Sequence, residues 1–144
     1  MAESPVDPAR SELMRRVRRR DTAPELAVRR ALTSLGLRYR LHAKELPGSP
    51  DIVNRRRKLA IFVHGCFWHR HANCRLASTP KTRTDFWEAK FARNVERDRR
   101  SEIALEENGW AVIVVWECQT RNPEQLRERL SESISTIHAS AHTT

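Results

Sequence analysis

Hydrophobic residues recur at the spacing of amphipathic helices in three segments of this chain. The first segment opens at Thr22 and the second at Asp85, and each has a glutamate three residues later, as in a capping box. Each of these two segments is followed by a glycine, which commonly stops a helix. The expected helices are 22–35, 85–108 and 123–138.

Shorter runs rich in β-branched and aromatic residues lie between the helices and predict strands. The last run, 111–116, is apolar throughout, which is typical of a central strand covered on both faces. This order of helices and strands predicts an α/β fold, in which helices flank a mixed central β-sheet. The expected strands are 37–42, 51–54, 59–64 and 111–116.

The two middle strands are expected to form a hairpin around a basic turn. A symmetric turn pairs Asn54 with Leu59 and Asp51 with Phe62. Because residues two apart share a face, His64 then lies on the face of Asp51, diagonal to it and about 7–8 Å away. In this register both side chains can address one hydrated ion or one phosphate.

The length of 144 residues fits a single domain with one hydrophobic core. We place this domain at 21–138, after a flexible basic arm at 1–20 and before a disordered tail at 139–144. Within the arm, 11–20 has the pattern of a short basic helix that orders on a partner. The longest apolar run is far shorter than the roughly 18 residues of a membrane span, and no apolar signal peptide opens the chain, so a cytoplasmic location is expected.

The charge balance indicates a polyanionic partner. Lys and Arg total 27 against 18 Asp and Glu, which gives a net charge of +9 and a pI near 10.6. Basic side chains that contact phosphates release condensed counterions and thereby gain affinity. A solvated basic surface without a partner is the alternative. The excess is clustered at 15–20, 55–58 and 97–100.

Cysteine and histidine gather directly after the hairpin. The spacing C-x4-H-x2-C occurs there, and a third cysteine follows the last strand. Such a set can bind zinc with four ligands and tie a loop to a core, which leaves no position open for catalysis. The alternative is three buried thiols and a surface histidine. The expected ligands are Cys66, His71, Cys74 and Cys118, with His64 and His69 as competing histidine donors.

Asp51 and His64 together have the chemistry of a metal-dependent hydrolase. Aspartate is a common Mg²⁺ ligand in phosphoryl chemistry, and a histidine beside it can take a proton from water. An aspartate that only forms a turn before the strand is the alternative. Asp98 lies within the apolar stripe formed by Trp87, Phe91, Val95 and Leu105 on the long helix, where an acid either faces a polar site or lowers stability.

Two aromatic pairs flank the cysteine-rich segment. Phe67 and Trp68 are consecutive in a stapled loop and cannot both point into a sheet core, so we interpret them as groups that stack on bases or wedge between them. Phe86 and Trp87 begin the long helix, where core packing is the ordinary role. The segment 65–83 is too polar and cysteine-rich for regular structure, so we expect a loop.

Three segments closely resemble the very short patch repair (Vsr) DNA mismatch endonucleases of bacteria, namely HGCFWHRHANC, TRTDFWEAKFARNVERDRR and GWAVIVVWEC. The likeness extends from about Met14 to Cys118, and RDTAPE and LPGSPDIV match as well. It implies a restriction-endonuclease-like core with a structural zinc loop. It also implies a Mg²⁺-dependent enzyme that nicks one strand 5′ of the thymine in a T:G mismatch, which arises by deamination of 5-methylcytosine. The nick opens a very short repair patch.

The resemblance assigns roles to individual residues. Asp51 is the direct ligand of the catalytic Mg²⁺, with the backbone carbonyl of Val63. Structural Zn²⁺ is held by the three cysteines and His71. Glu25, which its cap position explains fully, becomes a functional residue, and so does Trp87. The groups that hold the water shell or move protons are Glu25, His64, His69 and Asp98, and the resemblance leaves open which of them is the general base. The groups that wedge into the base stack are Phe67, Trp68 and Trp87, and Met14 enters from the other groove.

The resemblance also implies a monomer that acts on double-stranded DNA near the bacterial nucleoid, with no membrane partner and with mismatch-repair proteins as candidate partners. One departure is that Ala72 and Asn73 separate the loop histidine from the second cysteine by one residue more than in the family. Restriction nucleases usually have a Glu-x-Lys motif at the position of residues 62–64. This chain has Phe-Val-His there instead. The family it resembles lacks the Glu-x-Lys motif in the same way. Two alternatives stay open: a restriction-type nuclease that cuts matched DNA, and a non-catalytic zinc-stabilised DNA-binding module.

Overall fold

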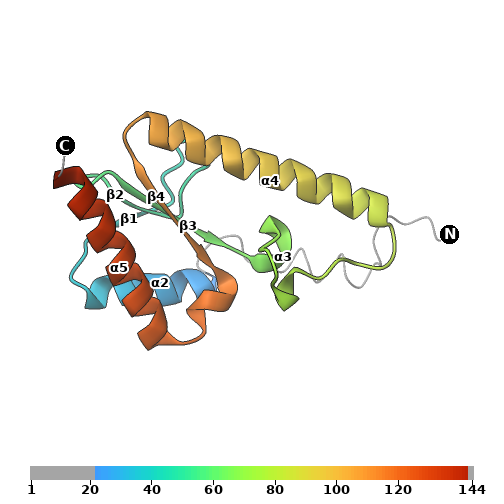
Figure 1. Cartoon of the computed structure of the whole chain (residues 1–144), viewed down its shortest axis with the longest axis horizontal. Coiled ribbons are helices and arrows are strands. Elements are labelled where there is room, and N and C mark those ends of the chain that lie inside the picture. Colours follow the sequence, from blue (N-terminus) through green and yellow to red (C-terminus); the bar gives the residue numbers. More distant parts are fainter. Residues whose placement is uncertain (1–21, 143–144) are drawn as a thin grey trace.

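One four-stranded mixed sheet forms the centre of the protein (Figure 1). The computed structural model describes the backbone of residues 22–142 and the side chains of residues 22–137. The predicted arm at 1–20, which includes Met14, lies outside the described residues. The elements are α2 (Ala23–Ser34), β1 (Arg40–Leu41), β2 (Ile52–Asn54), β3 (Leu59–His64), α3 (Cys66–His69), η1 (Arg75–Ala77), α4 (Thr84–Glu107), β4 (Ala111–Trp116), η2 (Glu117–Thr120) and α5 (Pro123–His142).

Helices cover both faces of this sheet, as Figure 1 shows: α2 and α5 lie on one face and α4 on the other. On the first face, Leu32 of α2 and Leu130 of α5 are fully buried against Ile61. On the second face, Leu105 of α4 packs with Phe62. The predicted α/β architecture, with a mixed sheet between helices, is confirmed. Among the described residues, no helix has the length and apolarity that a membrane span needs.

The hairpin has the predicted register. β2 and β3 are antiparallel, and Asn54 pairs with Leu59 and Ile52 with Ile61. β1 is much shorter than the expected strand 37–42, because the backbone of His42 turns at a φ of 50°. Its ladder still continues for one more residue, since the His42 N–H donates to the Asp51 carbonyl at 2.9 Å.

β4 lies at the edge of the sheet and not at its centre. In the described part of the chain it pairs only with β3, in parallel. Its residues are nevertheless apolar throughout because Ile113 and Val115 face the α2–α5 side while Val112 and Val114 face α4. The prediction of a central strand was therefore wrong, since cover from helices on both faces produces the same pattern as two neighbouring strands.

The helix starts differ in how well the sequence predicted them. Thr22 caps α2 as expected, and its hydroxyl accepts the Glu25 N–H at 3.3 Å. α4 begins at Thr84, after Arg83 in the left-handed region, and no side chain caps it, so the capping box expected from Asp85 is not formed. α4 ends as predicted, before Gly109 at a φ of +84°. Its apolar stripe is interrupted because Val95 is 43% exposed.

Two further boundaries depart from the predictions. The segment 65–83 is not a plain loop, because it contains the short helices α3 and η1. The closing helix α5 runs to His142 and so extends past the end expected at about His138. The residues added, Ala-Ser-Ala-His, contain no glycine or proline that would stop a helix.

Candidate active site and metal centre

Asp51 is fixed at the end of β2 by backbone contacts. The Val63 N–H donates to its Oδ2 at 2.7 Å, and its own carbonyl accepts the His42 N–H. The pKa of the Asp51 carboxyl is raised to about 6, mainly by burial and also by the neighbouring Glu25, while the Val63 N–H, His42 and His69 act in the opposite direction. The carboxyl is therefore held in one orientation and binds a proton more readily than an exposed aspartate.

Glu25 and His42 complete a cluster around Asp51. Glu25 is only 3% exposed, and its Oε1 lies 3.8 Å from His42 Nε2 and 3.4 Å from an Arg29 nitrogen. Ligand atoms of Glu25, His42 and Asp51 all lie within 4.8 Å of one another. The backbone of Glu25 serves the helix cap while its carboxylate serves this cluster.

His42 was not among the site residues predicted from the sequence. The signal that could have found it is its place at the end of the first predicted strand, where the sheet sets it opposite Asp51. No register was derived for that strand, so the pairing was not recognised.

A second cluster joins His64, His69 and Asp98, which come from β3, α3 and α4. His69 Nδ1 lies 2.5 Å from Asp98 Oδ2, and the His69 ring stacks on His64 with centroids 3.9 Å apart at an interplanar angle of 6°. Burial, together with His69, lowers the pKa of His64 to about 4, so this imidazole is neutral at pH 7. Asp98 interrupts the apolar face of α4 because it points at a polar site, one of the two interpretations offered by the sequence.

The two clusters are adjacent but distinct. No cluster of ligand atoms among the described residues contains both Asp51 and His64. His69 links them electrostatically, because its charge lowers the pKa of Asp51 and of His64. The sequence predicted that Asp51 and His64 lie about 7–8 Å apart and address one hydrated ion, which stays a prediction. In the structure the ligand atoms of Asp51 cluster with Glu25 and His42, and those of His64 cluster with His69 and Asp98.

The predicted cysteine–histidine set converges at one point. The described cysteines form no disulfide. His71 Nδ1 lies 3.7 Å from Cys66 Sγ and 3.4 Å from Cys118 Sγ. The His71 ring also stacks on Trp116, with centroids 4.3 Å apart. Ligand atoms of Cys66, His71, Cys74 and Cys118 all lie within 4.8 Å of one another.

Three thiols and one imidazole in this arrangement are a donor set that fits a tetrahedral soft metal ion. Between the loop histidine and the second cysteine, the backbone of Asn73 lies in the left-handed region, at a φ of 56°. Since Cys66 follows β3 and Cys118 follows β4, the centre can fasten the segment 65–83 to the sheet.

The aromatic residues form a cluster against α4. The Phe67 ring meets Trp68, Trp87 and Phe91 edge-on, with centroids 5.0, 5.8 and 5.2 Å apart. Trp87 is buried, while Phe67 and Trp68 are half-buried. The consecutive rings do not enter the sheet core, as expected, but rest on the long helix.

Arg70 holds this aromatic segment together. Its guanidinium donates to the carbonyls of Phe67, Ala77 and Ser78 at 3.1, 2.7 and 3.2 Å. It also lies 4.0 Å from the centre of the Phe91 ring, a cation–π distance. The sequence carries no signal for this role, because Arg70 is one of many arginines in a basic chain.

Carboxylates and imidazoles lie at the ends of neighbouring strands of this α/β protein, beside a Cys₃His centre, and the chain is strongly basic. These features define the class of nucleic-acid hydrolases. Comparison with known proteins identifies the particular family. Residues 6–76 match the family model described as DNA mismatch endonuclease Vsr.

Three relatives cover most of this chain. The DNA mismatch endonuclease Vsr of Escherichia coli is 46% identical over 98% of this chain and 93% of its own length. The nicking enzyme V.XorIIP of Xanthomonas oryzae pv. oryzae is 51% identical over 84% of this chain and 88% of its own length. The nicking enzyme V.NmeAIP of Neisseria meningitidis is 44% identical over 89% of this chain and 91% of its own length. The chain belongs to the Vsr family of DNA mismatch endonucleases, and the family resemblance in the sequence is confirmed.

Proposed function

We propose that this DNA endonuclease nicks one strand 5′ of the thymine in a T:G mismatch that arises from 5-methylcytosine, using Mg²⁺, on a restriction-endonuclease-like core. The observation that carries the proposal is the half-buried Asp51 carboxyl, oriented by the Val63 N–H at 2.7 Å beside the His69–Asp98 pair. Membership of a mismatch endonuclease family indicates the reaction, and these side chains are the groups that this reaction needs.

Asp51 and the Val63 carbonyl would hold the catalytic metal. The half-buried carboxylate of Asp51 and the buried carboxylate of Glu25 fit a hard divalent cation, because their mutual repulsion is relieved when a positive charge lies between them. When bound, Mg²⁺ supplies Lewis-acid stabilisation of the charge that builds on the scissile phosphate. His42, which faces Glu25 at 3.8 Å, is placed to donate to water at the same point.

His64 and His69 would move the proton of the attacking water. His64 is neutral at pH 7 because burial disfavours its charged form, so it can accept a proton. The Asp98 carboxylate orients the His69 ring and stabilises that ring when it becomes charged. Which of the two histidines takes the proton first is left open, because both lie in the same cluster with Asp98.

The rings of Phe67, Trp68 and Trp87 would read the mismatch. A mismatched step unstacks more readily than a matched one, so an inserted ring converts weak pairing into a difference in binding free energy. Phe67 and Trp68 are half-buried and rest on a buried ring, which supports them as a wedge. Met14 would enter from the other groove.

The Cys₃His centre would hold structural Zn²⁺, which leaves no open position for water. Its role is to keep the wedge at a fixed place relative to Asp51. We further propose that the enzyme is a monomer with a single endonuclease domain, active in the bacterial cytoplasm.

Matched duplexes that differ at one base pair test this function. We expect Mg²⁺-dependent nicking of one strand in a duplex with a T:G pair and none in the same duplex with a C:G pair. Cleavage of both strands of the matched duplex would instead indicate a restriction-type nuclease. Binding without cleavage of either duplex in Mg²⁺ would indicate a DNA-binding module.

A further inference from the structure

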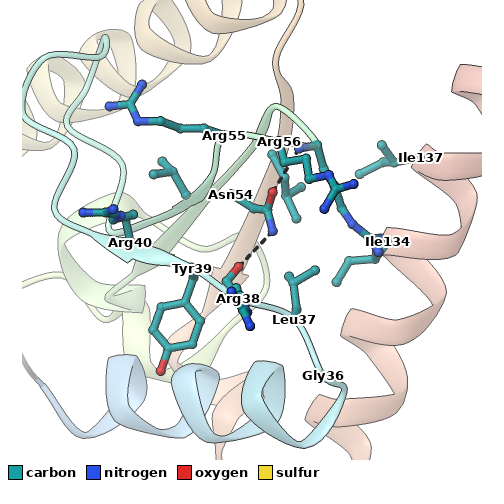
Figure 2. Close-up of a pocket in the computed structure, with 13 residues that line it drawn as sticks. Gly36, Leu37, Arg38, Tyr39, Arg40, Asn54, Arg55, Arg56, Ile134 and Ile137 are labelled. Atoms are coloured by element: carbon teal, nitrogen blue, oxygen red, sulfur yellow. Dashed lines mark hydrogen bonds between the residues drawn. The ribbon is translucent and has the colours of Figure 1, made fainter.

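A groove lies at the end of the sheet opposite the two clusters, between β1, the hairpin turn and α5 (Figure 2). β3 runs from Leu59 beside the groove to His64 in the site, and a rise of about 3.3 Å per residue separates these two ends by about 16 Å. The groove has a volume of about 1060 Å³, which suits a peptide segment better than a single small molecule. Nothing in the proposed nicking mechanism uses it.

The floor of the groove is aliphatic. Leu37, Ile134 and Ile137 pack against the core on the α2–α5 face but stay partly exposed to the groove, and Leu59 is buried below them. Figure 2 shows Ile134 and Ile137 on α5 facing the segment before β1 that carries Leu37. Apolar side chains partly open to solvent within a groove are typical of a binding surface.

The rim of the groove is positively charged. Arg38, Arg56 and Arg57 are exposed, and within the described part of the chain their guanidinium groups form no ion pair. By contrast, Arg55 pairs with Glu45, and Figure 2 shows it extending away from α5 while Arg56 extends toward it.

Asn54 fixes the backbone beneath this rim. Its Nδ2 donates to the Arg38 carbonyl at 2.8 Å and its Oδ1 accepts the Arg57 N–H at 2.9 Å. The two sides of the rim therefore keep a constant separation, so the three guanidinium groups are presented from a rigid base.

We propose that this groove binds an acidic peptide segment of a partner protein. Its carboxylates would meet the guanidinium groups of Arg38, Arg56 and Arg57, which form forked hydrogen bonds with carboxylates. Its apolar side chains would cover Ile134 and Ile137. Charge complementarity of this kind speeds association and fixes register, while the apolar contacts lengthen the life of the complex.

Duplex DNA is the weaker fit for the same groove. A phosphate backbone is polar and needs no aliphatic floor, and bases that stack need aromatic surfaces rather than Ile134 and Ile137. The groove also faces away from the end of β3 at which the DNA would be nicked.

A random library of 12-residue peptides displayed on phage tests this proposal. Selection on the full chain, with depletion on the variant Arg56→Glu/Arg57→Glu, is expected to enrich sequences that combine acidic and apolar residues. A synthetic peptide of the enriched sequence should bind at least about tenfold more weakly to that variant and to Ile137→Ser, measured by fluorescence anisotropy. The control Arg127→Glu/Arg129→Glu carries the same change of charge on exposed residues outside the groove and should bind as the wild type does.

Several outcomes would overturn the proposal. The first is that the selection enriches no peptides that combine acidic and apolar residues. The second is that the peptide binds Ile137→Ser as well as it binds the wild type. The third is that a DNA duplex displaces the peptide and itself binds the wild type about tenfold better than the rim variant. A dimer in sedimentation that Arg56→Glu/Arg57→Glu abolishes would assign the groove to a second copy instead. Nicking of the T:G duplex is measured in parallel and should be the same in the rim variant as in Arg127→Glu/Arg129→Glu, because the two variants carry the same change of net charge. The failure of nicking in the wild type would count against the proposed function and not against the groove.

Discussion

At the scale of single residues, the properties of the site come from backbone geometry as much as from side-chain identity. Asp51 is an ordinary aspartate in the sequence, yet the Val63 N–H orients it and burial beside Glu25 raises its pKa to about 6. His64 is an ordinary histidine whose pKa falls to about 4 by burial. Both shifts depend on contacts between different strands and helices, so the sequence could name these residues but not their charge.

Asp51→Asn is expected to reduce nicking of a T:G duplex by at least about 10³-fold, because a neutral amide is a poor replacement for a carboxylate that holds a divalent cation. DNA binding should be retained within about threefold, since the arginine-rich surface is unchanged. Single-turnover nicking and a gel-shift titration check both parts. Near wild-type nicking would remove Asp51 from the catalytic role, and Arg127→Ala serves as a control distant from it in sequence.

His64 makes the free energy of unfolding depend on pH. Its folded-state pKa of about 4 lies below the ordinary value of 6.5, so its contribution is present above pH 6.5 and is lost as pH falls toward 4. Wild type should therefore lose up to about 3 kcal/mol more than His64→Asn between these pH values. Urea unfolding of both proteins, with zinc held constant, measures the difference. If the free energy of unfolding changes with pH by the same amount in the two proteins, the prediction is wrong.

Asp51 acts in the opposite sense, so the comparison has to be made between two proteins that both retain it. Its folded-state pKa of about 6 lies above 3.8, so its contribution is present below pH 3.8 and is lost as pH rises through about 6. This term is common to wild type and His64→Asn and cancels in their difference.

At the scale of elements, the sequence predicted what depends on local pattern and missed what depends on neighbours. The register of β2 with β3 followed from a symmetric turn, and the start of α2 from Thr22. The edge position of β4 could not be predicted, because helices on both of its faces make it as apolar as a central strand. His42 joined the site through a pairing between strands, a relation that no local pattern records.

Arg70 is expected to position the aromatic cluster independently of the metal centre. Arg70→Ala removes donors to the carbonyls of Phe67, Ala77 and Ser78 and a cation over Phe91. The ratio of T:G to C:G duplex binding should fall by about tenfold, since each lost contact contributes roughly 0.5–1.5 kcal/mol. Zinc content should stay unchanged. Arg70→Lys, which keeps the charge but not the planar fork, should restore little of the ratio.

Cys118→Ser is expected to loosen the segment 65–83 from the sheet, because it removes the one ligand of the Cys₃His set that lies beyond β4. Bound zinc per chain and the free energy of unfolding should fall together, the latter by at least about 2 kcal/mol. Atomic absorption and urea unfolding measure the two quantities. Loss of neither would remove the zinc assignment. Ser78→Ala, in the same segment but outside the ligand set, is the matched control.

At the scale of the whole molecule, positive charge is spread over both ends of the sheet while the ionisable groups of the site lie at one end. The net charge of +9 explains attraction to DNA but not where DNA lies. Composition therefore predicted the class of partner, and only the arrangement of the elements separates the basic groove beside α5 from the nicking site. The groove and the nicking site are separated because they lie at opposite ends of β3. The sequence alone does not show which segments lie at each end of that strand.

Binding of a matched duplex should weaken steeply with salt. If about six phosphates are contacted, the logarithm of the binding constant falls with a slope of about −5 against the logarithm of salt concentration. The slope for a T:G duplex should be the same, because the added wedge contacts are uncharged. Anisotropy titrations from about 50 to 200 mM NaCl measure both slopes. A shallow slope would mean that the basic surface is solvated and makes no phosphate contacts.

The segment 65–83 leaves the end of β3 and rejoins the chain at the start of α4, and its Cys66, His71 and Cys74 converge with Cys118 of η2, which directly follows β4. Such a segment behaves as an exchangeable cassette, since neither its length nor its rings contribute to the pairing of the strands. Transplanting residues 65–83 from a relative, with His69 kept as histidine and Cys118 left in place, should transfer that relative's preference for the bases around the nick.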